Sequence, residues 1–166
     1  MSITCAKPNW NRAKQVAERV LQDNCLEEPP INAKELAERN GLTVSFVNFN
    51  RLGPEYSDIA GFINKNNVYV NADDTPARQN FTIAHELGHI LLEHDNYDIL
   101  YRRDLENQSN KTVEQEANYF AANLLVPEKM FKSFIKEYPY ASNKQLSDIF
   151  GVSKITIEHR RNRLGV

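Results

Sequence analysis

The sequence predicts a mostly helical α+β fold, with a small antiparallel sheet and a helix-turn-helix-like C-terminal segment. Several segments of ten or more residues repeat apolar side chains at spacings of three and four, as amphipathic helices do. Residues 42–49 alternate and are rich in β-branched and aromatic side chains, and residues 61–63 and 68–70 flank an Asn-Lys-Asn-Asn turn. With 166 residues, the chain is long enough for one compact unit that needs no disulfide or metal to fold.

Two helices are expected before the sheet. Asn9 is a capping residue for a helix that runs through Leu21, and Asn32 begins a short second helix that stops at Gly41. Two prolines separate these helices. The sheet that follows has two possible roles: an exposed edge strand can hold an extended substrate, or the hairpin simply covers the core.

The next helix carries the motif His-Glu-Leu-Gly-His at 85–89, and no glycine or proline interrupts residues 77–87. On a helix, His85 and His89 lie about 40° apart, so both ring nitrogens can reach one metal ion. Glu86 points about 100° further round, where it is placed to accept a proton from an attacking water rather than to bind the metal. The alternative is that two core or capping histidines lie four apart by chance.

A catalytic zinc ion usually takes three protein ligands. His94 follows His89 by five positions, about 140° round a continuing helix, and is therefore expected to be structural. The following helix, residues 112–126, offers Glu114 and Glu116. Glu116 borders the apolar stripe of this helix, whereas a carboxylate in the first turn, such as Glu114, could simply complement the helix dipole. We therefore favour Glu116 as the third ligand and keep Glu114 as the alternative.

Three further segments surround these residues. The first is Arg-Gln-Asn-Phe-Thr-Ile-Ala at 78–84, directly before the histidine motif, and the others are Glu-Ala-Asn-Tyr-Phe-Ala-Ala at 116–122 and Leu-Leu-Val-Pro at 124–127. Together they resemble the ImmA/IrrE family of cytosolic zinc metallo-endopeptidases, in particular its short, ImmA-like members. The resemblance covers roughly residues 30 to 130 and implies a zincin-like fold of the gluzincin type, in which the third ligand is a glutamate.

The resemblance also implies the roles of individual residues. It places Zn²⁺ on His85, His89 and Glu116 and makes Glu86 the catalytic glutamate. The implied substrate is a helix-turn-helix repressor of the Xre or ImmR type, cleaved to relieve transcriptional repression during stress or mobile-element induction. Two alternatives remain: a toxin-like or regulatory binding partner of a neighbouring repressor or antitoxin, and a DNA-binding regulator with a structural metal.

We expect a metallopeptidase domain over residues 1–141 and a helix-turn-helix-like segment over residues 142–166 packed on it, with Gly151 at the turn. The segment carries five basic residues against two acidic ones. Its second helix can meet DNA phosphates through three arginines, namely Arg160, Arg161 and Arg163. Alternatively, the hairpin closes a core or docks a protein, so DNA contact is at most weak or indirect.

Composition gives the expected compartment. The net charge of −2 gives no reason to expect avid binding of the whole molecule to nucleic acid or to anionic membranes. Cys5 and Cys25 fit no metal-binding spacing and are expected to be free thiols in a reducing compartment. The sequence shows neither a leader peptide nor an apolar run long enough to span a bilayer, so a cytoplasmic protein is expected.

Other residues between and on the ligand-bearing helices are weaker candidates. The segment 95–111 is either a substrate gate or a plain connection. It contains four candidate oxyanion-stabilising side chains, Tyr97, Tyr101, Arg102 and Arg103. Asn118 and Asn123 are candidates for orienting a zinc ligand.

Overall fold

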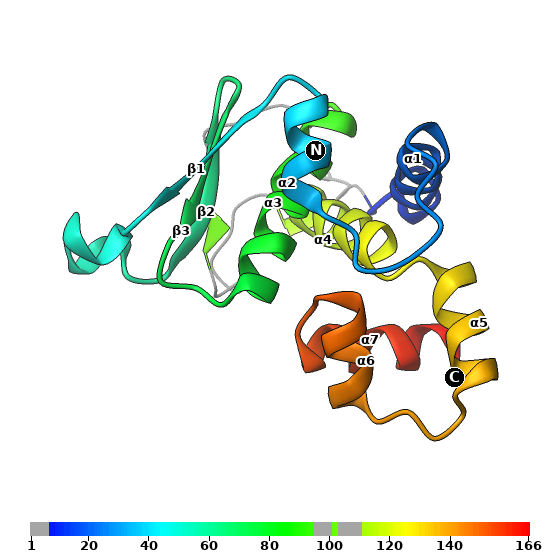
Figure 1. Ribbon diagram of the computed structural model, residues 1–166. Coiled ribbons are helices and arrows are strands. Elements are labelled where there is room, and N and C mark those ends of the chain that lie inside the picture. The colour runs from blue at the N-terminus through cyan, green and yellow to red at the C-terminus, as the bar shows by residue number, and fades with distance from the viewer. Residues whose placement is uncertain (1–6, 95–100, 103–110) are drawn as a thin grey trace, which may run out of the picture.

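The computed structural model describes residues 7–94, 101–102 and 111–166. Its elements in chain order are α1 (Trp10–Asp23), α2 (Ala33–Arg39), β1 (Thr43–Val47), the short 3₁₀ turns η1 (Phe49–Arg51) and η2 (Pro54–Tyr56), β2 (Ile59–Asn64), β3 (Asn67–Asn71), α3 (Pro76–Leu91), β4 (Tyr101–Arg102), α4 (Lys111–Leu125), α5 (Glu128–Glu137), α6 (Asn143–Phe150) and α7 (Lys154–Leu164). The sheet lies at one end of the molecule and α5 to α7 at the other, with α3 and α4 between them (Figure 1). The mostly helical α+β fold is thus confirmed.

The strands form a sheet in the order β1-β3-β2-β4. Strands β2 and β3 make the predicted antiparallel hairpin, in which Ile63 pairs with Val68 and Lys65 takes a left-handed conformation (φ 54°) at the turn. Strand β4 is antiparallel to β2. Strand β1 runs parallel to β3, so the sheet is mixed rather than purely antiparallel. The reason is topological: β1 and β2 run in opposite directions, and β3 lies between them.

Helix α3 begins at Pro76, directly before the stretch 77–87 that lacks glycine and proline. The Thr75 hydroxyl accepts a hydrogen bond from the Arg78 amide, and Pro76 occupies the first turn. The helix packs directly on the sheet because β2 has a glycine at the contact: a Cβ on Gly61 would lie 2.5 Å from Thr82 Cγ2. Helix α3 is therefore held on the sheet along one side and against α4 along another.

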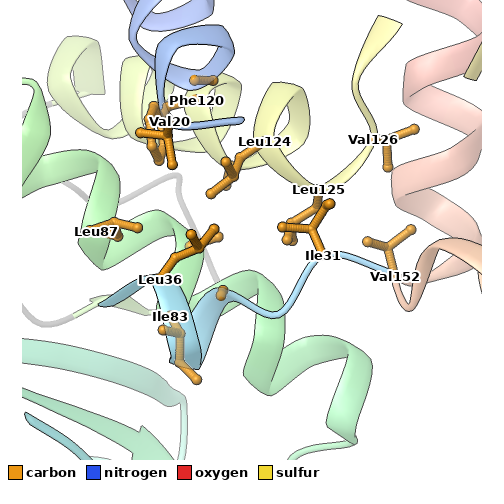
Figure 2. Close-up of a cluster of buried hydrophobic side chains, with 14 of the residues drawn as sticks. Val20, Ile31, Leu36, Ile83, Leu87, Phe120, Leu124, Leu125, Val126 and Val152 are labelled. Carbon is orange, nitrogen blue, oxygen red and sulfur yellow. The ribbon is translucent and has the colours of Figure 1, made fainter. Parts of the chain in front are cut away.

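The hydrophobic core is continuous from the N-terminal helices to the C-terminal ones. Figure 2 shows Val20 of α1, Leu36 of α2, Leu87 of α3 and Leu124 of α4 converging on it. Val152, from the turn between α6 and α7, belongs to the same buried cluster. The C-terminal segment thus belongs to the same hydrophobic core as α3, the helix that carries the histidine motif. The division of the chain at residue 142 remains a prediction.

The C-terminal segment has the local structure expected of a helix-turn-helix. Ser142 and Gln145 form a reciprocal capping box at the start of α6. Gly151 ends α6 in the left-handed conformation (φ 64°), and the Ser153 side chain caps α7. Among the described residues, Cys25 is a free, exposed thiol, whereas Cys5 lies outside them. No helix in the described part of the chain is both long and apolar enough to cross a membrane.

Candidate metal centre

The two motif histidines lie side by side on the buried face of α3. The His85 and His89 Nε2 atoms are 3.0 Å apart, and their rings meet edge to face. His85 is fully buried and His89 is 8% exposed. The predicted juxtaposition of the two imidazoles is therefore present.

Glu114 of α4 completes this cluster. Its Oε2 lies 3.1 Å from His85 Nε2, and its Oε1 lies 3.2 Å from His89 Nε2. One ligand atom from each of the three residues lies within 4.8 Å of the other two. The carboxylate can reach because α3 and α4 pack closely at Gly88, where a Cβ would lie 2.8 Å from Phe120 Cδ1.

Glu116, the glutamate that we favoured as the third ligand, lies elsewhere. Its Oε2 is 2.9 Å from His94 Nε2, and its Oε1 accepts a hydrogen bond of 2.6 Å from the Asn9 backbone N–H. Among the described residues, Glu114 and not Glu116 is the glutamate that lies beside the two motif histidines. The physical reason is that α4 is buried on two sides, against α3 and against α1. The position of Glu116 beside an apolar stripe therefore did not show whether its side chain faces α3 or α1.

A signal for Glu114 was present in the sequence. Positions 114, 117, 121 and 124 repeat at spacings of three and four, so Glu114 extends the buried stripe of Ala117, Ala121 and Leu124 back by one turn. Glu114 is only 2% exposed. Complementing the helix dipole does not require such burial, and the first-turn position was therefore a poor reason to discount it.

His94 does not face away from the histidine pair. Helix α3 ends at Leu91, Glu93 takes a left-handed conformation (φ 53°), and the His94 amide donates to the His89 carbonyl (3.0 Å). This reversal brings His94 Nδ1 to 2.9 Å from His89 Nδ1. His94 would face away only if the helix continued, and α3 ends at Leu91.

Glu86 is buried beside the cluster, with 1% of its surface exposed. Burial raises the pKa of Glu86 well above its ordinary value, and the charge of Glu114 raises it further. Within the described residues, Glu86 Oε1 has no hydrogen-bond partner. A buried carboxyl that has a raised pKa and an oxygen without a hydrogen-bond partner among the described residues is suited to exchanging a proton with a substrate or water.

Two of the ligand candidates, Glu114 and His89, have shifted proton affinities. Burial by itself raises the pKa of Glu114, but its close contacts with the His85 and His89 rings lower this pKa to about 2. Burial lowers the pKa of His89, against the opposing effect of the Glu114 carboxylate. An ionised carboxylate and a neutral imidazole are the forms in which these groups bind a metal.

The donor set fits a divalent metal ion. The Asn118 amide oxygen lies 2.9 Å from His85 Nδ1, so this nitrogen donates and His85 Nε2 is left with a lone pair. That lone pair faces the Glu114 carboxylate, whose Oε2 is buried without a hydrogen-bond partner among the described residues. Two acceptors held together in the interior need a cation between them. Two imidazoles and one carboxylate are typical ligands of catalytic zinc.

The remaining candidates, for orienting a ligand or stabilising an oxyanion, differ in where they lie. Asn118 contacts a motif histidine, as considered, whereas Asn123 donates to the Tyr119 carbonyl and accepts from Arg160. Tyr97 and Arg103 lie outside the described residues, and residues 101 and 102 are described only as strand β4.

The three C-terminal arginines are engaged within the molecule. Arg160, 2% exposed, donates to the Val126 carbonyl and to Asn123 Oδ1, both at 2.8 Å. Arg161 donates to the Ala141 carbonyl. The Arg163 guanidinium lies over the rings of Trp10 and Tyr119. These contacts hold α7 on the rest of the molecule.

A cleft of 630 Å³ opens between α3, α4 and α7. Asn118 is among its lining residues. His85, Glu86, His89 and Glu114 are not among the residues that line this cleft, although Asn118 contacts His85.

A buried His-His-Glu cluster with an adjacent glutamate, on two packed helices beside a small sheet, is the core of a metallopeptidase-type domain. Residues 37–162 match the Peptidase_M78 family model, described as the IrrE N-terminal-like domain. The match covers most of the chain, and the protein belongs to this family. The resemblance to the ImmA/IrrE family is thus confirmed.

One solved structure with a similar fold is a Mycobacterium tuberculosis transcriptional regulator, with a TM-score of 0.64 and 19% sequence identity. The similarity covers 90% of this chain and 46% of that one, so the present chain spans less than half of that protein's length. At this identity the likeness concerns the fold alone. No curated protein matches the chain.

Proposed function

We propose that this protein is a zinc-dependent endopeptidase in which His85, His89 and Glu114 hold the metal and Glu86 is the catalytic base. The observation that carries the proposal is the buried convergence of the three ligand atoms, which all lie within 4.8 Å of one another. Beside them is the buried Glu86, whose Oε1 has no hydrogen-bond partner in the part of the chain that the structure describes. Membership of a metallopeptidase family supports the same chemistry.

Each residue has a defined task in this proposal. Zinc, when bound, polarises the peptide carbonyl and lowers the pKa of water. Glu86 accepts a proton from the water that attacks the carbonyl carbon, and then passes this proton to the nitrogen of the breaking C–N bond. Asn118 keeps the Nε2 lone pair of His85 directed at the site. The products are a free carboxylate and a free amine.

The proposed substrate is a helix-turn-helix repressor of the Xre or ImmR type in the cytoplasm. Family membership supports this substrate class. The engagement of Arg160, Arg161 and Arg163 in internal contacts favours a protease over a DNA-binding regulator. Cleavage of the repressor would relieve transcriptional repression.

The test is Glu86→Gln, which keeps the size of the side chain and removes its ability to accept a proton. Purified zinc-loaded protein is mixed with a purified helix-turn-helix repressor of the Xre or ImmR type, and fragments are identified by mass spectrometry. We expect the cleavage rate to fall by about 10²- to 10⁴-fold, the range for loss of a general base. Zinc content is expected to be unchanged.

Glu93→Gln is the matched control, because Glu93 lies just after the same helix and its side chain is 84% exposed. This variant is expected to cleave at the wild-type rate. Cleavage by Glu86→Gln at the wild-type rate would refute the proposed base. Stable binding of the repressor without cleavage by the wild type would favour the binding-partner alternative.

A further inference from the structure

A chain of hydrogen bonds leads from His89, away from the candidate metal centre, to Asn9, the N-cap residue of α1. His89 Nδ1 lies 2.9 Å from His94 Nδ1, and His94 Nε2 lies 2.9 Å from Glu116 Oε2. Glu116 Oε1 accepts the Asn9 backbone N–H at 2.6 Å. His94 and Glu116 are only 6% and 8% exposed, so water does not readily replace these contacts.

The direction of every bond in this chain follows from its far end. A backbone N–H can only donate, and an ionised carboxylate can only accept, so His94 Nε2 must donate to Glu116. The remaining nitrogen of a neutral His94 ring is then an acceptor, and His89 Nδ1 must donate to it. His89 Nε2, facing Glu114 at 3.2 Å, is left with the lone pair that a metal needs.

We propose that His94 and Glu116 are positioning residues that fix the tautomer and ring orientation of His89 for metal binding. Neither residue contacts the ion: Glu116 acts through His94, and His94 acts through His89. This inference rests on the proposed metal centre. It assigns a role to Glu116, which lies outside the His85–His89–Glu114 cluster, and to a histidine expected to be only structural.

Substitution of His94 by an isosteric pair separates positioning from packing. His94→Asn supplies a side-chain oxygen that can accept the His89 Nδ1–H, whereas His94→Leu has nearly the same shape and no acceptor. We expect His94→Leu to lower the zinc affinity by about 10- to 100-fold, the range for loss of an outer-shell partner. His94→Asn should stay closer to the wild type than to His94→Leu.

Glu116→Gln tests the direction of the chain with a minimal change of shape. The Asn9 N–H requires an acceptor, so the glutamine oxygen turns to it and the glutamine NH₂ faces His94. This donor reverses both histidines and places a proton on His89 Nε2, where the metal binds. We expect a loss of zinc affinity of about 10- to 100-fold. In a His94→Leu background, Glu116→Gln should have little further effect because the chain is already broken.

Zinc affinity is measured by competition with a chromophoric chelator, and the Co²⁺-substituted proteins are compared by their visible d–d spectra, which report ligand geometry. Thermal unfolding of the metal-free variants reports folding separately. His159→Leu, at an exposed histidine of α7, is the control and is expected to bind zinc as the wild type does.

Equal zinc affinities in wild type, His94→Leu and Glu116→Gln would overturn the proposed relay. So would equal losses in His94→Asn and His94→Leu, because packing alone would then explain them. If His94→Leu does not fold, Glu116→Gln still decides the question. Failure of the wild type itself to bind zinc would instead refute the proposed metal centre, so the two failures are distinguishable.

Discussion

The α3/α4 interface and the C-terminal helices both bury ionisable side chains, but they satisfy them differently. At the α3/α4 interface, Glu86 and Glu114 each keep a buried oxygen without a hydrogen-bond partner among the described residues. In the C-terminal segment, the buried Arg160 guanidinium is aimed at two acceptors, the Val126 carbonyl and Asn123 Oδ1. Carboxyl oxygens buried without a partner destabilise the metal-free protein. The hydrogen bonds of Arg160, in contrast, stabilise the contact between α7 and the C-terminal end of α4.

This difference teaches how to interpret buried charge in this chain. Buried polar groups that remain unsatisfied in a packed interior are typical of sites that bind or react, whereas satisfied ones are typical of structural contacts. Glu86 and Glu114 meet this criterion at the α3/α4 interface, which supports the metal centre proposed there. Arg160, Arg161 and Arg163, which suggested DNA contact in the sequence, contact other parts of the molecule and attach α7 to it.

The largest expected effect is the loss of metal binding in Glu114→Gln. Removing a direct ligand should weaken zinc binding by more than the about 10- to 100-fold produced by losing an outer-shell partner. Zinc content after dialysis and chelator competition measure the effect. Zinc affinity unchanged in Glu114→Gln and abolished in Glu116→Gln would restore Glu116 as the ligand.

The next effect tests the C-terminal side of the comparison. Arg160→Met keeps most of the apolar length of the side chain but leaves the Val126 carbonyl and Asn123 Oδ1 buried without this donor. We expect the free energy of unfolding to fall by about 3 kcal/mol, with zinc affinity unchanged. Urea denaturation of the metal-free protein measures it.

Arg163→Met is the matched control for this variant. Arg163 lies 4.0 Å from the centre of the Tyr119 ring and 4.7 Å from that of Trp10, in cation–π contacts. Its loss should lower stability by only about 1 kcal/mol. Equal effects of the two substitutions would show that the buried hydrogen bonds of Arg160 contribute no more than a surface contact.

The order of the elements could be predicted because local signals specify it. Asn9, Asn32, Thr75 and Ser153 all cap helices through their side chains, as their positions before apolar repeats suggest. The pairing of β1 with β3 could not be predicted, because strand neighbours depend on contacts between distant parts of the chain.

The site was partly predictable for the same reason. The two histidines and Glu86 share one helix, so helical geometry alone relates them. The choice between Glu114 and Glu116 depends on which neighbour each face of α4 meets, and that requires the positions of α1 and α3. The position of His94 depends on the left-handed conformation of Glu93, which could not be predicted because the residue is not a glycine.

A smaller effect is expected where the two ligand-bearing helices touch. In Gly88→Ala, the added Cβ would lie 2.8 Å from Phe120 Cδ1 and 3.4 Å from Ala117 Cα, so α4 must shift. Overpacking of about 1–3 kcal/mol, less the roughly 1 kcal/mol that alanine gains in a helix, should leave a net destabilisation of about 1 kcal/mol. Denaturant unfolding measures the stability and chelator competition the accompanying loss of zinc affinity. A variant more stable than the wild type with full zinc affinity would contradict the proposed importance of this close contact.

The smallest effect concerns an exposed charge, where neither burial nor an unsatisfied group is involved. Glu128 of α5 accepts from Lys132 (2.7 Å) and from Lys14 of α1 (2.6 Å), and these bonds lower the pKa of Glu128 to about 2. A lowered carboxyl pKa stabilises the fold above its ordinary value of 4.5, and this contribution is lost as the pH falls from there toward about 2. Because all three side chains are partly exposed, solvent screening limits the contribution to about 1 kcal/mol.

Glu128→Gln should therefore be less stable than the wild type at pH 7 and nearly equal to it at pH 2, as measured by urea unfolding at both values. Glu38→Gln, which removes an exposed pair with Lys34 within α2, controls for the loss of a surface carboxylate. A gap between Glu128→Gln and the wild type that persisted at pH 2 would mean that Glu128 stabilises the contact of α1 with α5 by packing rather than by charge.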